Sequence, residues 1–124
     1  MKSIDALLAE ARAGLQRIDA NTAAARLADG AVLVDVRTAE QRQADGLIPG
    51  AHVIALNHLE WRLDPTSAHR IAAAKDHDVD VIVLCDEGFC SSLAAARLQT
   101  LGLHRATDVI DGFRGWLAAG LPVE

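Results

Sequence analysis

The sequence predicts an α/β fold with three layers, in which helices cover both faces of a central parallel sheet. Two short runs, at residues 31–36 and 79–84, are largely apolar and rich in β-branched residues, which indicates strands buried on both faces. Apolar residues recur at helical spacing between and around these runs, so helices and strands alternate along the chain. Strands joined through helices run parallel, and such sheets bind ligands at the carboxyl ends of their strands.

The first two predicted elements are helices. Ser3 can cap a helix over residues 3–13. One side of this helix is apolar and carries Ile4, Leu7, Leu8 and Ala11. A second helix over residues 20–28 ends before Gly30, because glycine readily adopts the backbone conformation that closes a helix.

The middle of the chain is predicted to hold short elements. They are a polar helix, a turn, a strand and two helices, at residues 38–44, 46–50, 51–56, 57–63 and 66–75. Pro65 separates the last two, because proline disfavours a helical residue before it. Trp61 and, later in the chain, Trp116 are expected to pack in the core.

The last third of the chain repeats the strand–helix pattern. The buried strand at 79–84 is followed by a helix, a short strand and a final helix, at residues 91–101, 107–110 and 113–119. Gly120 and Pro122 end the final helix.

Length and composition restrict the classes of protein that fit. The 124 residues suit one domain over 1–124, with the helix at about 3–13 as an extension. A net charge of −5 and the absence of a basic cluster argue against a nucleic-acid partner. No apolar segment is long enough for a membrane span or a signal peptide, so we expect a cytoplasmic protein with no membrane partner. Two cysteines are too few for a disulfide framework or a four-cysteine zinc site, and we expect neither a metal nor a cofactor.

The segment that follows the second buried strand has the features of a reactive site. Cys85 ends the strand, Gly88 permits a tight turn, and a helix begins at Ser91. Backbone N–H groups in such a turn can converge as an anion-binding nest, and the helix N-terminus adds partial positive charge. These features favour the thiolate, which is the nucleophilic form of cysteine. Asp86 and Glu87 oppose this effect, since each acid costs a thiolate roughly 1 kcal/mol at ~7 Å and an effective dielectric of about 40. The two effects are comparable, so the sequence leaves the sign of the net pKa shift of Cys85 open.

Four motifs in order along the chain resemble those of a rhodanese-homology domain. They are Asp35-Val36-Arg37, the turn Gly46-Leu47-Ile48-Pro49-Gly50-Ala51, the loop Cys85 to Cys90 with Gly88 fourth, and Asp111-Gly112-Phe113-Arg114-Gly115-Trp116 followed by Gly120-Leu121-Pro122-Val123. The resemblance covers almost the whole chain and implies the three-layer rhodanese-like fold.

The resemblance also implies an activity and its residues. It implies that Cys85 is catalytic: the thiolate takes sulfane sulfur from thiosulfate or a persulfide donor, becomes a persulfide, and passes the sulfur to cyanide or a thiol. The loop would bind the substrate, and its residues are Asp86, Glu87, Gly88, Phe89, Cys90 and Ser91. Asp35 and Arg37 would form a buried structural pair behind the site. The sequence leaves the oligomeric state open.

The loop departs from the family pattern, and other functions fit it too. Cys90 stands where many members have arginine, and Asp86 where many have a basic residue, so we expect weak use of the thiosulfate anion. A loop that turns its amides inward is expected to turn Cys90 outward, which disfavours a disulfide with Cys85. Alternatives are a non-enzymatic binding module and a redox sensor that uses both cysteines. A phosphatase needs a longer Cys-x5-Arg loop and is set aside.

Overall fold

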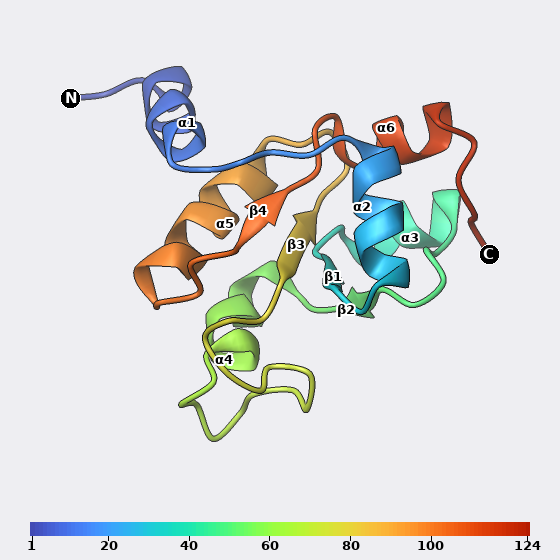
Figure 1. The fold of residues 1–124 in the computed structure, drawn as a ribbon. Coiled ribbons are helices and arrows are strands. Elements are labelled where there is room, and N and C mark those ends of the chain that lie inside the picture. Colours follow the sequence, from blue (N-terminus) through green and yellow to red (C-terminus); the bar gives the residue numbers. More distant parts are fainter.

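The computed structural model describes residues 1–124 and has a four-stranded sheet between two layers of helices (Figure 1). The strands are β1 (Val32–Asp35), β2 (His52–Val53), β3 (Val81–Leu84) and β4 (Thr107–Asp108), in the order β2-β1-β3-β4. Every strand pair is parallel, which confirms the predicted fold class. Because Asp35 pairs with Leu84, the carboxyl ends of β1 and β3 lie side by side at one edge of the sheet.

Six α-helices and one 3-10 helix surround the sheet. They are α1 (Ile4–Ala13), α2 (Ala20–Ala28), α3 (Ala39–Asp45), η1 (Leu56–His58), α4 (Leu59–Leu63), α5 (Cys90–Thr100) and α6 (Gly112–Ala118). Figure 1 shows α4 and α5 on one side of the sheet and α2 and α6 on the other. None of the helices has the length and apolar character needed to cross a bilayer.

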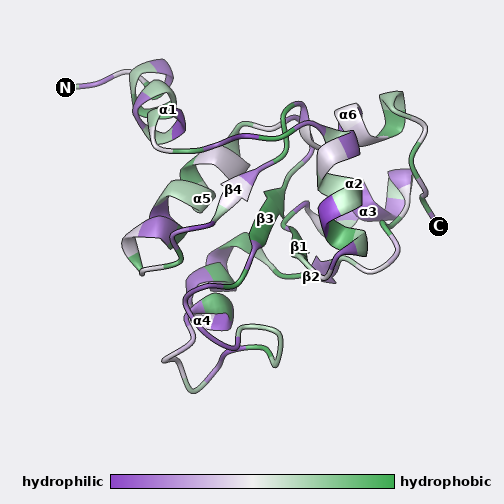
Figure 2. Cartoon of the chain, viewed as in Figure 1, coloured by the Kyte–Doolittle hydropathy of each residue, from purple (hydrophilic) through white to green (hydrophobic).

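The two central strands divide the core into two layers, because successive side chains of a strand point to opposite faces. Val34 and Val83 pack toward α4 and α5. Leu33 and Ile82 pack toward α2 and α6. Figure 2 shows β1 and β3 as apolar ribbons at the centre of the fold, between helices of mixed hydropathy. Burial on both faces explains why both strands read as continuous apolar runs in the sequence.

Side-chain caps set the starts of three helices. Ser3 Oγ accepts the backbone N–H of Ala6 at 3.0 Å at the start of α1, as predicted. Asp19 accepts the N–H of Thr22 at 2.8 Å in the same way for α2. Thr38 and the third residue of α3 form a reciprocal capping box. These local signals explain why the predicted starts of the three helices are confirmed.

Two predicted elements in the middle of the chain are wrong. Residues 66–75 form turns and not a helix, and β2 covers only two residues of the strand predicted at 51–56. Asp64 accepts the N–H of Thr66 at 2.9 Å, which starts a turn directly after α4. Residue 71 then donates its N–H back to Arg62 O at 2.8 Å, which closes the segment on itself. Turns closed by hydrogen bonds to the neighbouring residues 62 and 64 therefore replace the helix that the propensity of this alanine-rich segment predicts.

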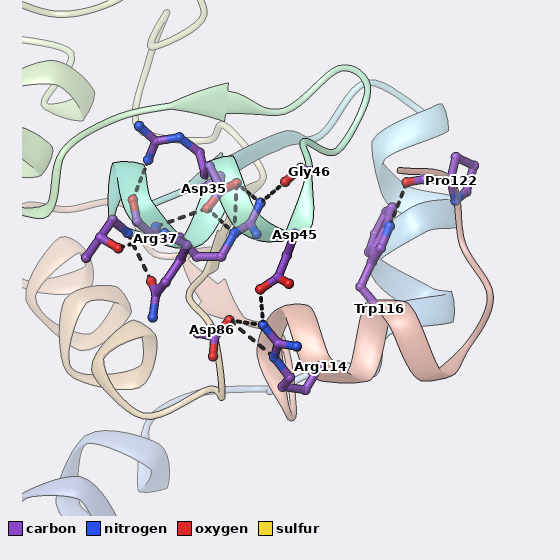
Figure 3. Close-up of polar contacts among 11 residues, drawn as sticks. Asp35, Arg37, Asp45, Gly46, Asp86, Arg114, Trp116 and Pro122 are labelled. Carbon is purple, nitrogen blue, oxygen red and sulfur yellow. Dashed lines mark hydrogen bonds and ion pairs between the residues drawn. The ribbon is translucent and has the colours of Figure 1, made fainter. Parts of the chain in front are cut away.

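The two tryptophans have different environments. Trp116 is buried, and its Nε1 donates to Pro122 O at 2.9 Å (Figure 3). Trp61 is 57% exposed, so its predicted core position is wrong. The short helix α4 buries Leu59 and Leu63, one turn apart, and this places Trp61 on the opposite side.

Candidate active site

Cys85 lies at the end of β3, where a four-residue loop connects the strand to α5. Its side chain is 5% exposed. The loop turns sharply at Gly88, whose φ of 89° is rarely adopted by other residues. The start of α5 follows directly, so the partial positive charge of this helix end lies beside the sulfur.

Several donors converge on the Cys85 sulfur. The backbone N–H of Gly88 donates to Sγ at 3.1 Å, and the thiol of Cys85 can itself donate to Ser91 Oγ at 3.3 Å, because the Ser91 hydroxyl proton is directed to Asp108. The Cys90 thiol is the strongest of these partners, followed by Ser91 and the Gly88 amide, and together they lower the pKa of Cys85 to about 5 against the opposing effect of burial. A pKa of about 5 favours the reactive thiolate at neutral pH, and its largest cause is the Cys90 side chain, with smaller effects from the backbone N–H groups of the loop.

The loop turns three of its carbonyl groups away from the sulfur and onto the rest of the protein. The carbonyls of Cys85 and Asp86 accept backbone N–H groups from the start of α6 at 2.8 and 3.1 Å, and that of Gly88 accepts Arg12 at 2.8 Å. In a planar trans peptide the N–H points opposite to the carbonyl. The three following N–H groups therefore point to the inner side of the loop, where a bound anion or an outer sulfur atom would lie.

Cys90 does not turn outward, and that expectation is wrong. Its side chain is half-buried and lines the same groove as Cys85, and it lowers the pKa of the Cys85 thiol. The neighbouring thiolate and burial raise the pKa of Cys90, so Cys90 stays protonated and acts as a donor. Phe89 takes the outward position instead and is 56% exposed. Both cysteines are free.

One of the two acidic residues of the loop is paired with an arginine, and the other is not. Arg114 of α6 bridges Asp86 and Asp45, and its Nη2 lies 2.9 Å from Asp86 Oδ1 (Figure 3). Glu87 is exposed and makes no ion pair. The loop is therefore less acidic than the sequence alone indicates, because one of its two charges is balanced by a residue 28 positions away.

At the neighbouring strand end, Asp35 and Arg37 form a closed pair (Figure 3). Arg37 Nη2 donates to Asp35 Oδ2 and to Gly46 O, both at 2.8 Å, and both side chains are almost fully buried. The guanidinium also stacks on Phe113, 3.7 Å from the ring centre, and only its Nη1 has no hydrogen-bond partner. These contacts fit the structural role that the sequence predicts.

A groove of about 1040 Å³ opens beside the loop. The predicted site residues that line it are Cys85, Asp86, Glu87, Phe89, Cys90 and Arg37. Gly88 and Ser91 are buried behind the sulfur, and Asp35 lies farther back. Val53 and Leu56 add exposed apolar side chains to the rim, and Arg42 and Arg97 add cations. No group of three histidine, cysteine or acidic side chains is placed to hold a metal ion.

Sequence reasoning missed the residues that fix the start of α5. Asp108 of β4 is fully buried and accepts Ser91 Oγ at 2.7 Å and Ser92 Oγ at 2.8 Å. Arg17 Nε lies 2.9 Å from its other oxygen. An acidic residue in a predicted buried strand is a usable signal, because such a charge needs partners. Nothing in the sequence connects Arg17 with the loop.

Gly112 was recognised only as part of a motif, and the structure shows why this position is glycine. A side-chain Cβ here would lie 2.4 Å from Cys85 O and 2.9 Å from Gly88 N. Gly112 also has a φ of 53°, in the left-handed region. The start of α6 therefore packs directly against the outer side of the Cys85 loop.

Known proteins resemble this chain in sequence and in structure. Residues 19–119 match the rhodanese-like domain family. The thiosulfate sulfurtransferase GlpE of Actinobacillus pleuropneumoniae serotype 7 (strain AP76) is 34% identical over 98 residues, which are 77% of this chain and 80% of that protein.

Two solved structures extend the comparison. The protein RPA3614 of Rhodopseudomonas palustris CGA009, described as of unknown function and a possible tyrosine phosphatase, is 31% identical with a TM-score of 0.89, over 100% of this chain and 96% of that one. A rhodanese-related protein of Thermoplasma volcanium is 24% identical with a TM-score of 0.68, over 87% of this chain and 96% of that one. The latter likeness concerns the fold alone.

Proposed function

This chain belongs to the rhodanese-like domain family, and from that membership we propose that it is a sulfurtransferase whose Cys85 carries the transferred sulfur as a persulfide. The family and the relatives named thiosulfate sulfurtransferase support a role in sulfur transfer. The observation that carries the persulfide assignment is the convergence of donors on Cys85 Sγ, with the pKa of this thiol lowered to about 5.

In the first half-reaction the Cys85 thiolate attacks the outer, sulfane sulfur of the donor. With thiosulfate, the new S–S bond to Cys85 forms as the bond to the sulfonate sulfur breaks, and sulfite leaves with the bonding electron pair. The inward N–H groups of the loop would hold the negative charge of the donor and then of the persulfide.

In the second half-reaction a nucleophile attacks the outer sulfur of the persulfide. Cyanide would leave as thiocyanate, and a thiolate would leave as a new persulfide. In both cases the electron pair of the broken S–S bond returns to Cys85, which restores the thiolate. The lowered pKa of Cys85 makes it a good leaving group in this step, as it makes the thiolate available in the first.

The groove supports substrates larger than an inorganic anion. Its volume of about 1040 Å³ is at the upper end of the usual range for organic ligands, roughly 300–1,000 Å³. The exposed Val53, Leu56 and Phe89 at its rim favour an organic or protein-borne persulfide as donor, or such a thiol as acceptor. Thiosulfate would use only the loop at the end of the groove.

Intact-mass measurement tests the assignment directly. The protein is treated with thiosulfate or polysulfide, freed of excess donor, and weighed beside the Cys85→Ser and Cys90→Ser variants. We expect one added sulfur atom in the wild type and in Cys90→Ser and none in Cys85→Ser. A gain that survives in Cys85→Ser and disappears in Cys90→Ser would refute the assignment. A wild type that takes up no sulfur from any donor would instead favour a binding module.

A second candidate role involves both cysteines, because they line the same groove and the Cys90 side chain lowers the pKa of Cys85. The Cys90 thiolate could attack Cys85 Sγ of the persulfide, form a Cys85–Cys90 disulfide and release hydrosulfide with the electron pair. The raised pKa of Cys90 opposes this step, since little thiolate is available to attack. Non-reducing peptide mapping after thiosulfate treatment without an acceptor distinguishes the roles. A linked peptide with a matching amount of sulfide would establish the redox role, and free Cys90 would exclude it.

A phosphatase reading has less support from the loop. The comparison with a possible tyrosine phosphatase raises it. The loop from Cys85 to Cys90 ends in cysteine where a phosphatase needs arginine, and it is one residue shorter than Cys-x5-Arg. Arginine binds the phosphate oxygens with two hydrogen bonds, and a thiol cannot replace it. Steady hydrolysis of an aryl phosphate that is lost in Cys85→Ser would reverse this judgement.

A further inference from the structure

The Cys85 loop is held from its outer side by residues that precede the region matching the family. The matched region begins at residue 19, and Arg12 and Arg17 lie before it. Arg12 Nη2 donates to Gly88 O at 2.8 Å, and Arg17 Nη2 donates to the same oxygen at 3.1 Å. A single buried carbonyl of the loop therefore receives two charged donors from the N-terminal segment.

Gly88 connects these arginines with the sulfur through its own backbone. Its N–H donates to Cys85 Sγ at 3.1 Å, while its carbonyl accepts the two arginines on the other side of the loop. The planar peptide that contains this carbonyl also fixes the direction of the Phe89 N–H, which points to the inner side. The position of Gly88 thus decides one N–H that donates to the reacting sulfur and the direction of the next N–H along the loop.

Each arginine makes a second contact that limits its freedom. Arg12 Nε donates to Ser92 Oγ at 3.0 Å, and its guanidinium lies 5.9 Å from the ring centre of Phe89. Arg17 pairs with buried Asp108, which also accepts Ser92 Oγ at 2.8 Å. The two side chains, the loop and the first turn of α5 therefore form one connected network.

The segment that carries the arginines is itself anchored. Ile18 N donates to Asp108 O at 3.2 Å and Ile18 O accepts Ile110 N at 2.8 Å, so this part of the chain runs beside β4. Thr107 Oγ1 donates to Gln16 O at 2.9 Å. Figure 1 shows the segment after α1 passing the tip of β4 on its way to α2. Arg17 therefore extends from a fixed support, and Arg12 lies on α1 directly before it.

We propose that Arg12 and Arg17 are positioning residues for sulfur transfer, which hold Gly88 so that its N–H stays on the Cys85 sulfur and the next N–H faces inward. The proposal rests on the proposed function for its consequence in catalysis. Neither arginine touches the sulfur or lines the groove. Their effect passes through the geometry of the loop, and their charge alone would not reproduce it.

Arg12 is the better residue to test, because removing Arg17 would leave the buried Asp108 without its charged partner. Arg12→Gln removes the charge and Arg12→Lys keeps it. Lysine is a point charge and cannot span Gly88 O and Ser92 Oγ as the planar guanidinium does. The matched control is Lys2→Gln, which removes an exposed cation of the same region that pairs with Glu10 at 2.7 Å.

Two measurements are made on each folded variant. The rate of alkylation by iodoacetamide against pH reports the pKa of Cys85 whether or not sulfur transfer occurs. The rate of sulfur loading from thiosulfate reports the reaction. We expect both Arg12 variants to raise the midpoint of alkylation by about one unit, the scale of one weakened hydrogen bond, and to slow loading about tenfold. Lys2→Gln should change neither.

Restoration of the midpoint and of the loading rate by Arg12→Lys would overturn the proposal, since charge alone would then suffice. An unchanged midpoint in Arg12→Gln would overturn it as well. If Arg12→Gln does not fold, the alkylation midpoint and the loading rate of the charge-retaining Arg12→Lys variant decide between the outcomes. If the wild type loads no sulfur, the proposed function fails, and the alkylation midpoint still tests the positioning role.

Discussion

The carboxyl ends of β1 and β3 lie side by side at one edge of the sheet, and the polar groups at the two ends have different hydrogen-bond partners. After β1, the Asp35 carboxylate is matched by Arg37, and the guanidinium in turn bonds Gly46 O and stacks on Phe113. Nearly all of the hydrogen-bonding atoms of this pair have partners inside the protein. After β3, three carbonyls of the loop accept hydrogen bonds from the rest of the protein, and the N–H of Gly88 donates to the Cys85 sulfur.

The difference separates a structural site from a reactive one. A buried charge that is matched by an opposite charge, and has all but one of its hydrogen-bonding atoms partnered, has little left with which to stabilise a changing charge. When the carbonyls of a loop are hydrogen-bonded to the rest of the protein, its N–H donors are already oriented. No free energy of reorganisation is then needed at the moment of reaction. Both strand ends have buried and charged groups, so neither burial nor charge identifies the reactive site. The direction of the backbone N–H and carbonyl groups identifies it.

The largest expected effect comes from forcing the reactive loop out of shape. Gly112→Ala would place a Cβ 2.4 Å from Cys85 O, so the loop must move. We expect sulfur loading to fall about 100-fold or more, comparable to the loss of one or more donors at an oxyanion site. Loading kinetics and the midpoint of thermal unfolding are measured together.

Gly120→Ala is the matched control for this prediction. Gly120 also has a positive φ, of 70°, but a Cβ there would meet nothing within 4 Å. Both variants bear the conformational cost of about 1–2 kcal/mol for a left-handed residue, and only one disturbs the loop. Equal losses of loading in the two variants would show that close packing of α6 on the loop is unimportant.

At the structural strand end the expected loss is one of stability. Asp35→Ala leaves Arg37 buried and without its carboxylate, which should lower the free energy of unfolding by about 3–5 kcal/mol. Sulfur loading per folded molecule should stay near the wild-type value. Chemical denaturation and loading at low temperature test the two statements. Full stability with no loading would move Asp35 into the reactive site.

The pH dependence of the alkylation rate tests the lowered pKa of Cys85 at the reactive strand end. Because the thiolate is the reactive form and the pKa of Cys85 is lowered to about 5, alkylation should be fast and flat above about pH 6 and should fall about tenfold per unit below pH 5. Removing the donor in Cys90→Ala should move the midpoint upward, whereas Cys90→Ser keeps a donor and should move it less. A wild-type midpoint near 8.5, the ordinary value, would contradict the structure of the loop.

The smallest expected effect concerns the charge of the loop. Since Arg114 balances Asp86, the exposed Glu87 is the acid left to repel an anionic donor. Glu87→Gln should raise kcat/KM for thiosulfate about two- to fivefold at low salt, and the gain should shrink as salt rises. Asp29→Asn, an exposed acid at the other end of β1, should have no effect. An equal gain from Asp29→Asn would assign the effect to net charge.

The sequence by itself determined the fold class, the two central strands and the place of Cys85. These follow from local physics, because a strand buried on both faces must be apolar and a tight turn into a helix needs glycine at a fixed position. The caps of the first three helices are local in the same way, since Ser3, Asp19 and Thr38 bond N–H groups three residues on.

Only the tertiary structure decided how the loop is charged and held. Arg114 reaches Asp86 from 28 residues away and Arg12 reaches Gly88 from 76, and no local pattern records such distances. The position of the Cys90 side chain is likewise set by contacts outside its own segment. The same holds for residues 66–75, which form turns in place of the predicted helix. A reactive site depends on where backbone groups and charges from separate segments point, and that is settled only when the chain packs.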